Sequence, residues 1–196
     1  MKPYSESCDQ NKYPILDVLK IELAHTKHLL EIGSGTGQHA VFFGAQMPDI
    51  IWQTSDRLEY HPGIQLWLAD SRLNNVLPPI ELDVALNHWP QQTFDAIFSA
   101  NTAHIMSAPE VEHMFTGVGN LLTTGGRFCL YGPFNYHGNY TSESNARFEQ
   151  WLKNRDPNSG IKDIDDLHRW AEPPGLRLAA DHEMPANNRI LVWVKQ

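Results

Sequence analysis

The feature that most constrains this chain is a glycine-rich turn of sequence GSGTG at residues 33–37. A short apolar run at residues 28–32 precedes the turn, and apolar residues at helical spacing follow it through residues 40–43. Glycines let the backbone turn tightly and approach a ligand closely. A strand, a glycine turn and a helix in this order therefore predict one unit of a parallel α/β sheet and a candidate binding site.

The same alternation of apolar runs and helix-period stretches continues along the chain. We expect strands at residues 28–32, 50–54, 80–84, 94–99 and 127–131 and helices beginning at Pro14, Pro62 and Val111. The runs at residues 177–180 and 190–194 leave no room for a crossover helix, so they predict an antiparallel hairpin. The predicted fold is an α/β, doubly wound, Rossmann-like seven-stranded sheet, mostly parallel with a C-terminal antiparallel hairpin.

A length of 196 residues fits one domain. Within residues 1–196 we expect an N-terminal cap and helix at about residues 1–27. We also expect an insert on the substrate side at about residues 132–157, in which Thr141 or Ser142 caps a helix. Because this insert follows a buried strand, it lies where open α/β sheets bind ligands.

Composition excludes several classes of function. With 15 Lys and Arg against 23 Asp and Glu, the formal charge is −8, which argues against broad binding to a nucleic-acid backbone. No apolar stretch approaches the roughly 18 residues of a membrane span, and the N-terminus lacks a signal-peptide pattern. Cys8 and Cys129 cannot form a disulfide framework or a thiolate zinc site, and the ten His suggest no ligand set, so we predict no metal. These features predict a cytoplasmic protein of unknown oligomeric state with no membrane partner.

The spacing of the turn is G-x-G-x-G and differs from the G-x-G-x-x-G of dinucleotide enzymes. Glu31 lies just before the glycines, where a carboxylate is unfavourable for a phosphate and suits a ligand with a cationic amino group. S-adenosylmethionine (SAM) has such a group and no phosphate. Asp56 could accept from the ribose hydroxyls, Asp83 from the adenine amino group with Val84 against the ring, and Asn101 could bond the amino-acid portion.

Candidate catalytic residues follow the fourth and fifth predicted strands, where an acceptor would meet the methyl group. They are His104, Tyr131 and His137. His104 is the best-placed general base, which is needed only if the acceptor must lose a proton. The alternative is a structural His in a loop, and Tyr131 could equally be a packing residue.

The glycine turn and the strand-end acids closely resemble the class I SAM-dependent methyltransferase superfamily. This resemblance implies SAM contacts at Glu31, Gly33, Gly35, Gly37, Asp56, Asp83 and Asn101, to which we add Ser34 and Val84 as cofactor-binding candidates. Segments such as NKYPIL at residues 11–16, GPF at 132–134, TSESN at 141–145 and MPANN at 184–188 are similar to a methyltransferase-like family of unknown function in bacteria and animals. That narrower resemblance implies that Asn11 and Lys12 close over the cofactor.

The leading hypothesis is a SAM-dependent methyltransferase acting on an unidentified, small-molecule acceptor. Arg147, Lys153 and Arg155 place positive charge beside the predicted pocket, which is compatible with an acidic substrate. One alternative is a catalytically silent SAM-binding regulatory or scaffold protein, which a substrate pocket closed by the insert would favour. A second alternative, an NAD-dependent oxidoreductase, is disfavoured by the glycine spacing and by Glu31.

Overall fold

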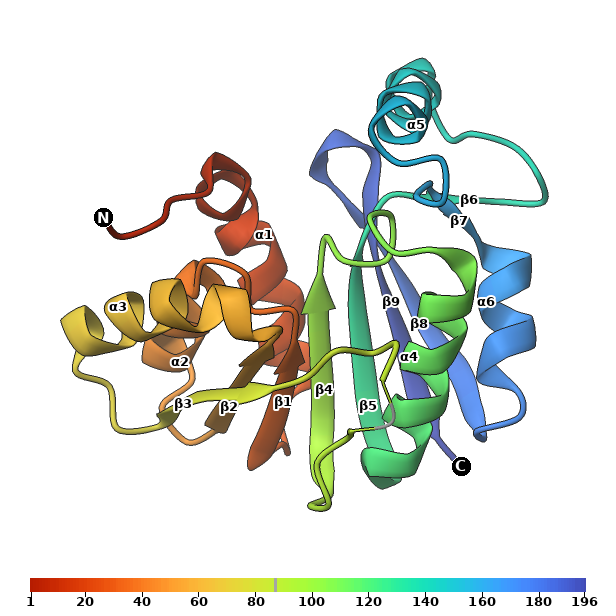
Figure 1. Cartoon of the computed structure of the whole chain (residues 1–196). Coiled ribbons are helices and arrows are strands. Elements are labelled where there is room, and N and C mark those ends of the chain that lie inside the picture. Colours follow the sequence, from red (N-terminus) through yellow and green to blue (C-terminus); the bar gives the residue numbers. More distant parts are fainter. Residues whose placement is uncertain (87) are drawn as a thin grey trace.

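The computed structural model describes residues 1–86 and 88–196 and contains a seven-stranded sheet in the order β3-β2-β1-β4-β5-β9-β8 (Figure 1). Five strands run parallel, and β9 is antiparallel to both β5 and β8. The strands are β1 (His28–Ile32), β2 (Ile51–Asp56), β3 (Val76–Glu81), β4 (Phe94–Ala100), β5 (Leu122–Gly132), β8 (Leu176–Met184) and β9 (Asn188–Lys195). The predicted fold class, including the C-terminal hairpin, is confirmed.

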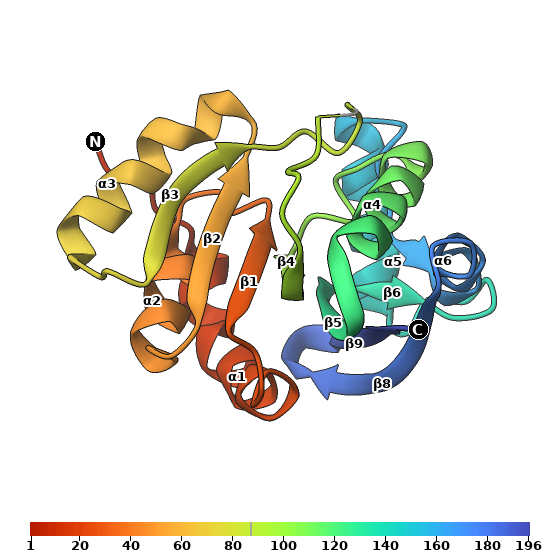
Figure 2. The ribbon, with the colours of Figure 1, turned by 90° about the horizontal axis from the view of Figure 1, so that it is seen from below.

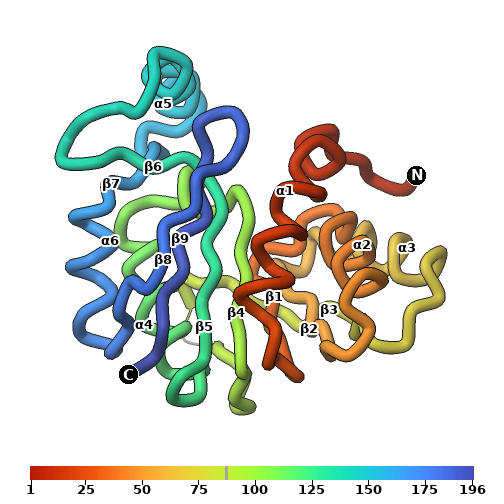
Figure 3. The backbone as a smooth tube through the Cα atoms, turned by 180° about the vertical axis from the view of Figure 1, so that it is seen from behind, coloured from red at the N-terminus to blue at the C-terminus, as the bar shows by residue number. Residues whose placement is uncertain are grey.

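Helices cover both faces of this sheet, as Figures 2 and 3 show from below and from behind. One face carries α1 (Glu6–Glu22), α2 (Gln38–Gln46) and α3 (His61–Ser71). The other face carries α4 (Ala108–Leu121) and α6 (Ile164–Ala171). None of the helices in the described ranges combines the length and apolar character of a membrane span.

Alternating apolar residues along the central strands create these two faces. Leu29 belongs to the core cluster under α1 and α2, whereas Leu30 belongs to the cluster under α4 and α6. Cys129 and Leu130 on β5 divide in the same way. A strand that is apolar at every position must be buried on both sides, since neighbouring side chains point to opposite faces.

The segment after β5 crosses the carboxyl end of the sheet before the chain returns to α6. It contains a small second sheet of β6 (Phe134–Asn135) paired with β7 (Lys162–Asp163), and between them α5 (Glu143–Arg155). Ser142 caps α5 through its Oγ, which accepts from the amide of Asn145 at 3.0 Å. The predicted helix and one of its two predicted caps are therefore confirmed. In Figure 1, α5 stands above the sheet at the end to which β4 points.

Several predicted boundaries are wrong. The fifth strand begins at Leu122 and not at residue 127, and α4 begins at Ala108 and not at Val111. The first helix begins at Glu6 and contains Pro14 in its interior, because Ser5 caps it one turn of polar sequence earlier. Proline in a helix removes one backbone hydrogen bond, here the one that the carbonyl of Gln10 would accept. The third strand ends at Glu81 and includes Pro78 and Pro79, which an edge strand tolerates because one side of its ladder is unpaired.

Candidate functional site

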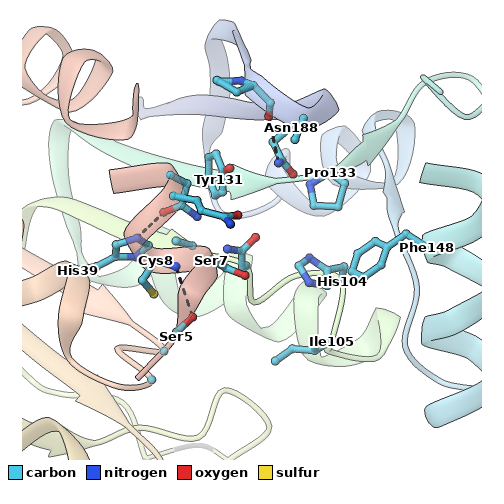
Figure 4. Close-up of a pocket in the computed structure, with 18 of the residues that line it drawn as sticks. Ser5, Ser7, Cys8, His39, His104, Ile105, Tyr131, Pro133, Phe148 and Asn188 are labelled. Carbon is cyan, nitrogen blue, oxygen red and sulfur yellow. Dashed lines mark hydrogen bonds between the residues drawn. The ribbon is translucent and has the colours of Figure 1, made fainter. Parts of the chain in front are cut away.

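A cavity of about 890 Å³ opens at the carboxyl ends of the parallel strands (Figure 4). Its walls are the N-terminal half of α1, the glycine turn, the residues that follow β4 and β5, the inner face of α5 and the turn between β8 and β9. The structure therefore brings together at one cavity seven of the predicted site residues. They are Asn11, Gly33, Ser34, Gly35, Asn101, His104 and Tyr131.

The glycine turn has the backbone geometry that only glycine adopts readily. Gly33, Gly35 and Gly37 all have positive φ values, of 73°, 57° and 89°. A Cβ on Gly33 would lie 2.6 Å from Cγ2 of Thr102, whereas a Cβ on Gly35 would meet nothing within 4 Å. Gly33 is therefore required for packing, and Gly35 leaves open space at the cavity wall. Gly37 does not line the cavity and is the N-cap of α2.

Glu31 lies behind the turn and does not line the cavity. Its Oε2 accepts from the hydroxyl of Ser34 at 2.8 Å and from the indole Nε1 of Trp52 at 3.1 Å. Burial raises the pKa of Glu31 to about 7, and these two hydrogen bonds offset part of the rise. The carboxylate thus fixes Ser34 in the turn, and direct contact of Glu31 with a ligand stays a prediction.

The two strand-end aspartates are engaged with backbone amides. Oδ2 of Asp56 accepts from the amide of Gly35 at 2.7 Å, and Oδ1 accepts from the amide of Arg57 at 2.8 Å. Oδ1 of Asp83 accepts from the amide of Ala85 at 2.9 Å. Neither aspartate lines the cavity, and Val84 is part of the core under α4. Their proposed roles toward ribose and adenine therefore stay predictions.

The N-terminal segment forms one wall of the cavity. The side-chain oxygen of Asn11 lies 2.7 Å from Nε2 of His39, which fixes the position of α1 over the start of α2. Burial lowers the pKa of His39 to about 4, so its ring is neutral and can donate this bond. Lys12, unlike Asn11, does not line the cavity. It pairs with Asp9 and lies over the ring of Phe42.

His104 lies on the wall opposite α1, where β4 has ended (Figure 4). It is 8 % exposed, its ring meets that of Phe148 edge-on with centroids 5.2 Å apart, and within the described residues its ring nitrogens have no hydrogen-bond partner. Burial, with a smaller contribution from the nearby Lys162, lowers the pKa of His104 to about 4. The imidazole is thus neutral at physiological pH and able to accept a hydrogen bond.

The other two catalytic candidates lie in different surroundings. Tyr131 is buried at the cavity wall, where burial raises the pKa of its hydroxyl while hydrogen bonds with Asn11 and Asn188 lower it. The prediction that His137 lies beside the other catalytic candidates is wrong, because His137 does not line the cavity. It occupies an exposed loop tip with φ of 53°, and its Nδ1 lies 3.0 Å from Oδ2 of Asp165. The pairing of β6 with β7 directs this loop toward α6.

The sequence did not single out several residues of the cavity. They are Ser5, Cys8 and His39 near the glycine turn, Phe148 and Trp151 on α5, and Pro185, Ala186 and Asn188 at the turn between β8 and β9. The spacing of residues 144, 145, 148, 151, 152 and 155 marks one face of α5, which is the signal that could have located that wall. No group of three or more His, Cys, Asp or Glu within residues 1–86 and 88–196 is placed to hold a metal ion.

Solved structures of methyltransferases share this fold. An O-methyltransferase family protein from Burkholderia thailandensis matches with a TM-score of 0.82 at 13 % identity, over 93 % of this chain and 55 % of its own. An O-methyltransferase family 2 protein from Planctomyces limnophilus, in complex with apigenin, matches with a TM-score of 0.83 at 15 % identity. This match covers 95 % of this chain and 56 % of the other. Human N-acetylserotonin methyltransferase in complex with SAM matches with a TM-score of 0.80 at 14 % identity. This match covers 97 % of this chain and 53 % of the other.

These similarities define the class of fold, that of the SAM-dependent methyltransferases, and confirm the resemblance that the glycine turn indicated. The chain spans about half the length of the methyltransferases that it matches. The family model described as "Protein of unknown function (DUF938)" matches residues 2–195, so this chain belongs to that family.

Proposed function

We propose that this protein transfers a methyl group from SAM to a small-molecule acceptor bound in the cavity. The observation that carries the proposal is that the glycine turn and His104 line the same cavity. The open space beside Gly35 fits a ligand held against the backbone of the turn. Ser34 and Asn101 line the same end and offer polar groups to it.

When bound, SAM supplies a methyl group that is already activated on a sulfonium. The protein's part is therefore to hold the acceptor in line with that methyl group and to exclude water. His104 accepts the proton that the acceptor loses as its new bond to carbon forms. Because its imidazole is already neutral, His104 needs no prior deprotonation above pH 5.

Calorimetric titration tests the cofactor assignment. The wild-type protein should bind SAM and S-adenosylhomocysteine but not NAD, and Gly35→Asp should abolish both by filling the space beside the turn. Gly125→Asp is the matched control, since Gly125 also has a positive φ and open space but is not among the cavity-lining residues. Binding of NAD alone, or unchanged SAM affinity in Gly35→Asp, would contradict the proposal.

A radiolabelled-methyl assay across metabolite, protein and RNA fractions tests transfer itself. Label should enter the metabolite fraction, and His104→Asn should retain SAM binding but lose transfer. The insert does not fill the cavity in this structure. Its helix α5 forms one wall of a space of about 890 Å³. SAM binding without transfer to any fraction would instead favour the silent regulatory protein.

A further inference from the structure

Charge is unevenly distributed around the cavity. The chain contains 23 Asp and Glu, yet none of them is among the cavity-lining residues in the described ranges. Arg155 is the one Lys or Arg among those residues. A cavity without lining carboxylates, in a chain of net charge −8, favours an acceptor that is neutral or anionic over a cationic one.

Arg155 is also the cation of α5 whose charge is not neutralised locally. Arg147 lies 3.8 Å from Glu143, and Lys153 lies 3.7 Å from Glu149, so both are paired along the helix. Arg155 forms no ion pair and no hydrogen bond with any residue that the structure describes. The positive charge that the sequence placed beside the pocket is therefore concentrated in one guanidinium at the cavity wall.

That guanidinium lies on an aromatic surface. Its Cζ is 4.6 Å from the centroid of the Trp151 ring, and Trp151 stacks on Phe148 with centroids 5.7 Å apart and planes at 17°. Trp151 is 49 % exposed although it lines the cavity. A guanidinium that lies over a ring and forms no hydrogen bond keeps its N–H groups available, and they can bind a carboxylate bidentately.

His104 connects this aromatic surface to the proposed chemistry, because its ring meets Phe148 edge-on. A planar aromatic ring against Phe148 and Trp151 would bury apolar area that the free protein leaves exposed. A group on that ring could then face His104 while an acidic group faces Arg155. The three side chains come from positions 148, 151 and 155, which share one face of a helix.

We propose that the methyl acceptor is an aromatic carboxylic acid that also carries a ring hydroxyl; this inference rests on the proposed function. Arg155 binds the carboxylate, Trp151 and Phe148 bind the ring, and His104 takes the hydroxyl proton. As the hydroxyl oxygen bonds to the methyl carbon, the carbon–sulfur bond breaks and its electron pair stays on sulfur. The products are the methyl ether, S-adenosylhomocysteine and a protonated His104.

The test compares hydroxylated benzoates, phenylacetates and cinnamates with their neutral amides, each titrated into the protein with S-adenosylhomocysteine present. At least one acid series should bind roughly tenfold more tightly than its amides, as expected for one charge-assisted pair at a partly exposed site. Arg155→Gln should remove that preference. Arg147→Gln is the matched control on the same helix and should retain it. Trp151→Leu should weaken the binding of both the acids and the amides.

Three results would overturn the inference: amides that bind as tightly as acids, a preference that survives Arg155→Gln, or no binding of either series. Titration of SAM into the same samples distinguishes the two proposals. If SAM binds and the aromatic acids do not, only the acceptor class is wrong. If SAM does not bind, the proposed function itself fails.

Discussion

Replacement of Glu31 by Gln should stabilise the protein by an amount that grows as the pH rises from 4.5 to 7. The carboxylate of Glu31 is buried behind the glycine turn, with a pKa of about 7 in place of 4.5. Above pH 7 the folded protein must hold a buried carboxylate whose burial is costly, whereas Gln keeps an oxygen to accept from Ser34 and Trp52. Glutamine therefore resembles the protonated acid in shape and stays uncharged at every pH.

The magnitude follows from linkage between protonation and folding. Between pH 4.5 and 7 the folded state binds more protons at Glu31 than the unfolded state, so stability contributed by this residue falls as pH rises. At about 1.4 kcal/mol for each pH unit, the loss is about 3 kcal/mol. The advantage of Glu31→Gln should thus be constant below pH 4.5, grow through the interval and level off above pH 7.

The pH dependence of the wild-type stability alone cannot reveal the contribution of Glu31, because two histidines change the stability in the opposite direction. The pKa of His39 and that of His104 are both lowered to about 4 by burial, so each adds stability as pH rises from about 4 to 6.5. The difference between variant and wild type cancels these contributions. Urea unfolding followed by tryptophan fluorescence between pH 4.5 and 8 measures it.

Glu112→Gln, on the exposed face of α4, is the control for loss of one formal charge and should show a flat difference. If Glu31→Gln also gives a difference that is constant with pH to within about 1 kcal/mol, the carboxylate is not held in a costly environment. The structural role assigned here to Glu31 would then be wrong.

Three further substitutions test other parts of the structure. Gly33→Ala, whose methyl would lie 2.6 Å from Thr102, should cost about 1–3 kcal/mol more than Gly125→Ala in thermal unfolding, because both have positive φ but only the first clashes; equal losses would contradict this. Ser107→Ala should cost about 1 kcal/mol by removing the capping box of α4, measured by urea unfolding against the wild type. Burial lowers the pKa of Lys162 to about 8, so the stability of the wild type relative to Lys162→Met should rise between pH 8 and 10.5. A stability difference that does not change with pH would refute this prediction.

The sequence predicted the central sheet well because local and long-range signals agree there. Three of the five residues 28–32 are apolar, and the next five residues include three glycines whose positive φ values form the turn. No other arrangement buries such a strand on both faces and still leads into a helix. The C-terminal hairpin was equally constrained, since so few residues separate its strands.

The rest of the site depends on three-dimensional packing that sequence patterns do not express. Asp83 matched a strand-end acid, but its carboxylate accepts from the amide of Ala85 in the following turn. His137 followed the fifth strand as a catalytic residue would, but the pairing of β6 with β7 carries it away from the cavity. The pattern of α5 predicted a helix correctly, yet periodicity does not say whether an apolar face meets a core or a cavity.

The distribution of charge around the cavity gives its two ends different preferences. Two of the acids expected to contact the cofactor, Glu31 and Asp56, lie behind the wall on the side of the glycine turn. Glu31 accepts from the hydroxyl of Ser34, and Asp56 accepts from the amide of Gly35. The guanidinium of Arg155 lies on the wall formed by α5, and Figure 4 shows Phe148 of that wall across the cavity from Ser5, Cys8 and His39. A cationic group is therefore favoured at the turn and an anionic group at α5. With His104 beside Phe148, an acceptor oriented by its acid group would present its reactive hydroxyl between these two ends, where the methyl group must arrive.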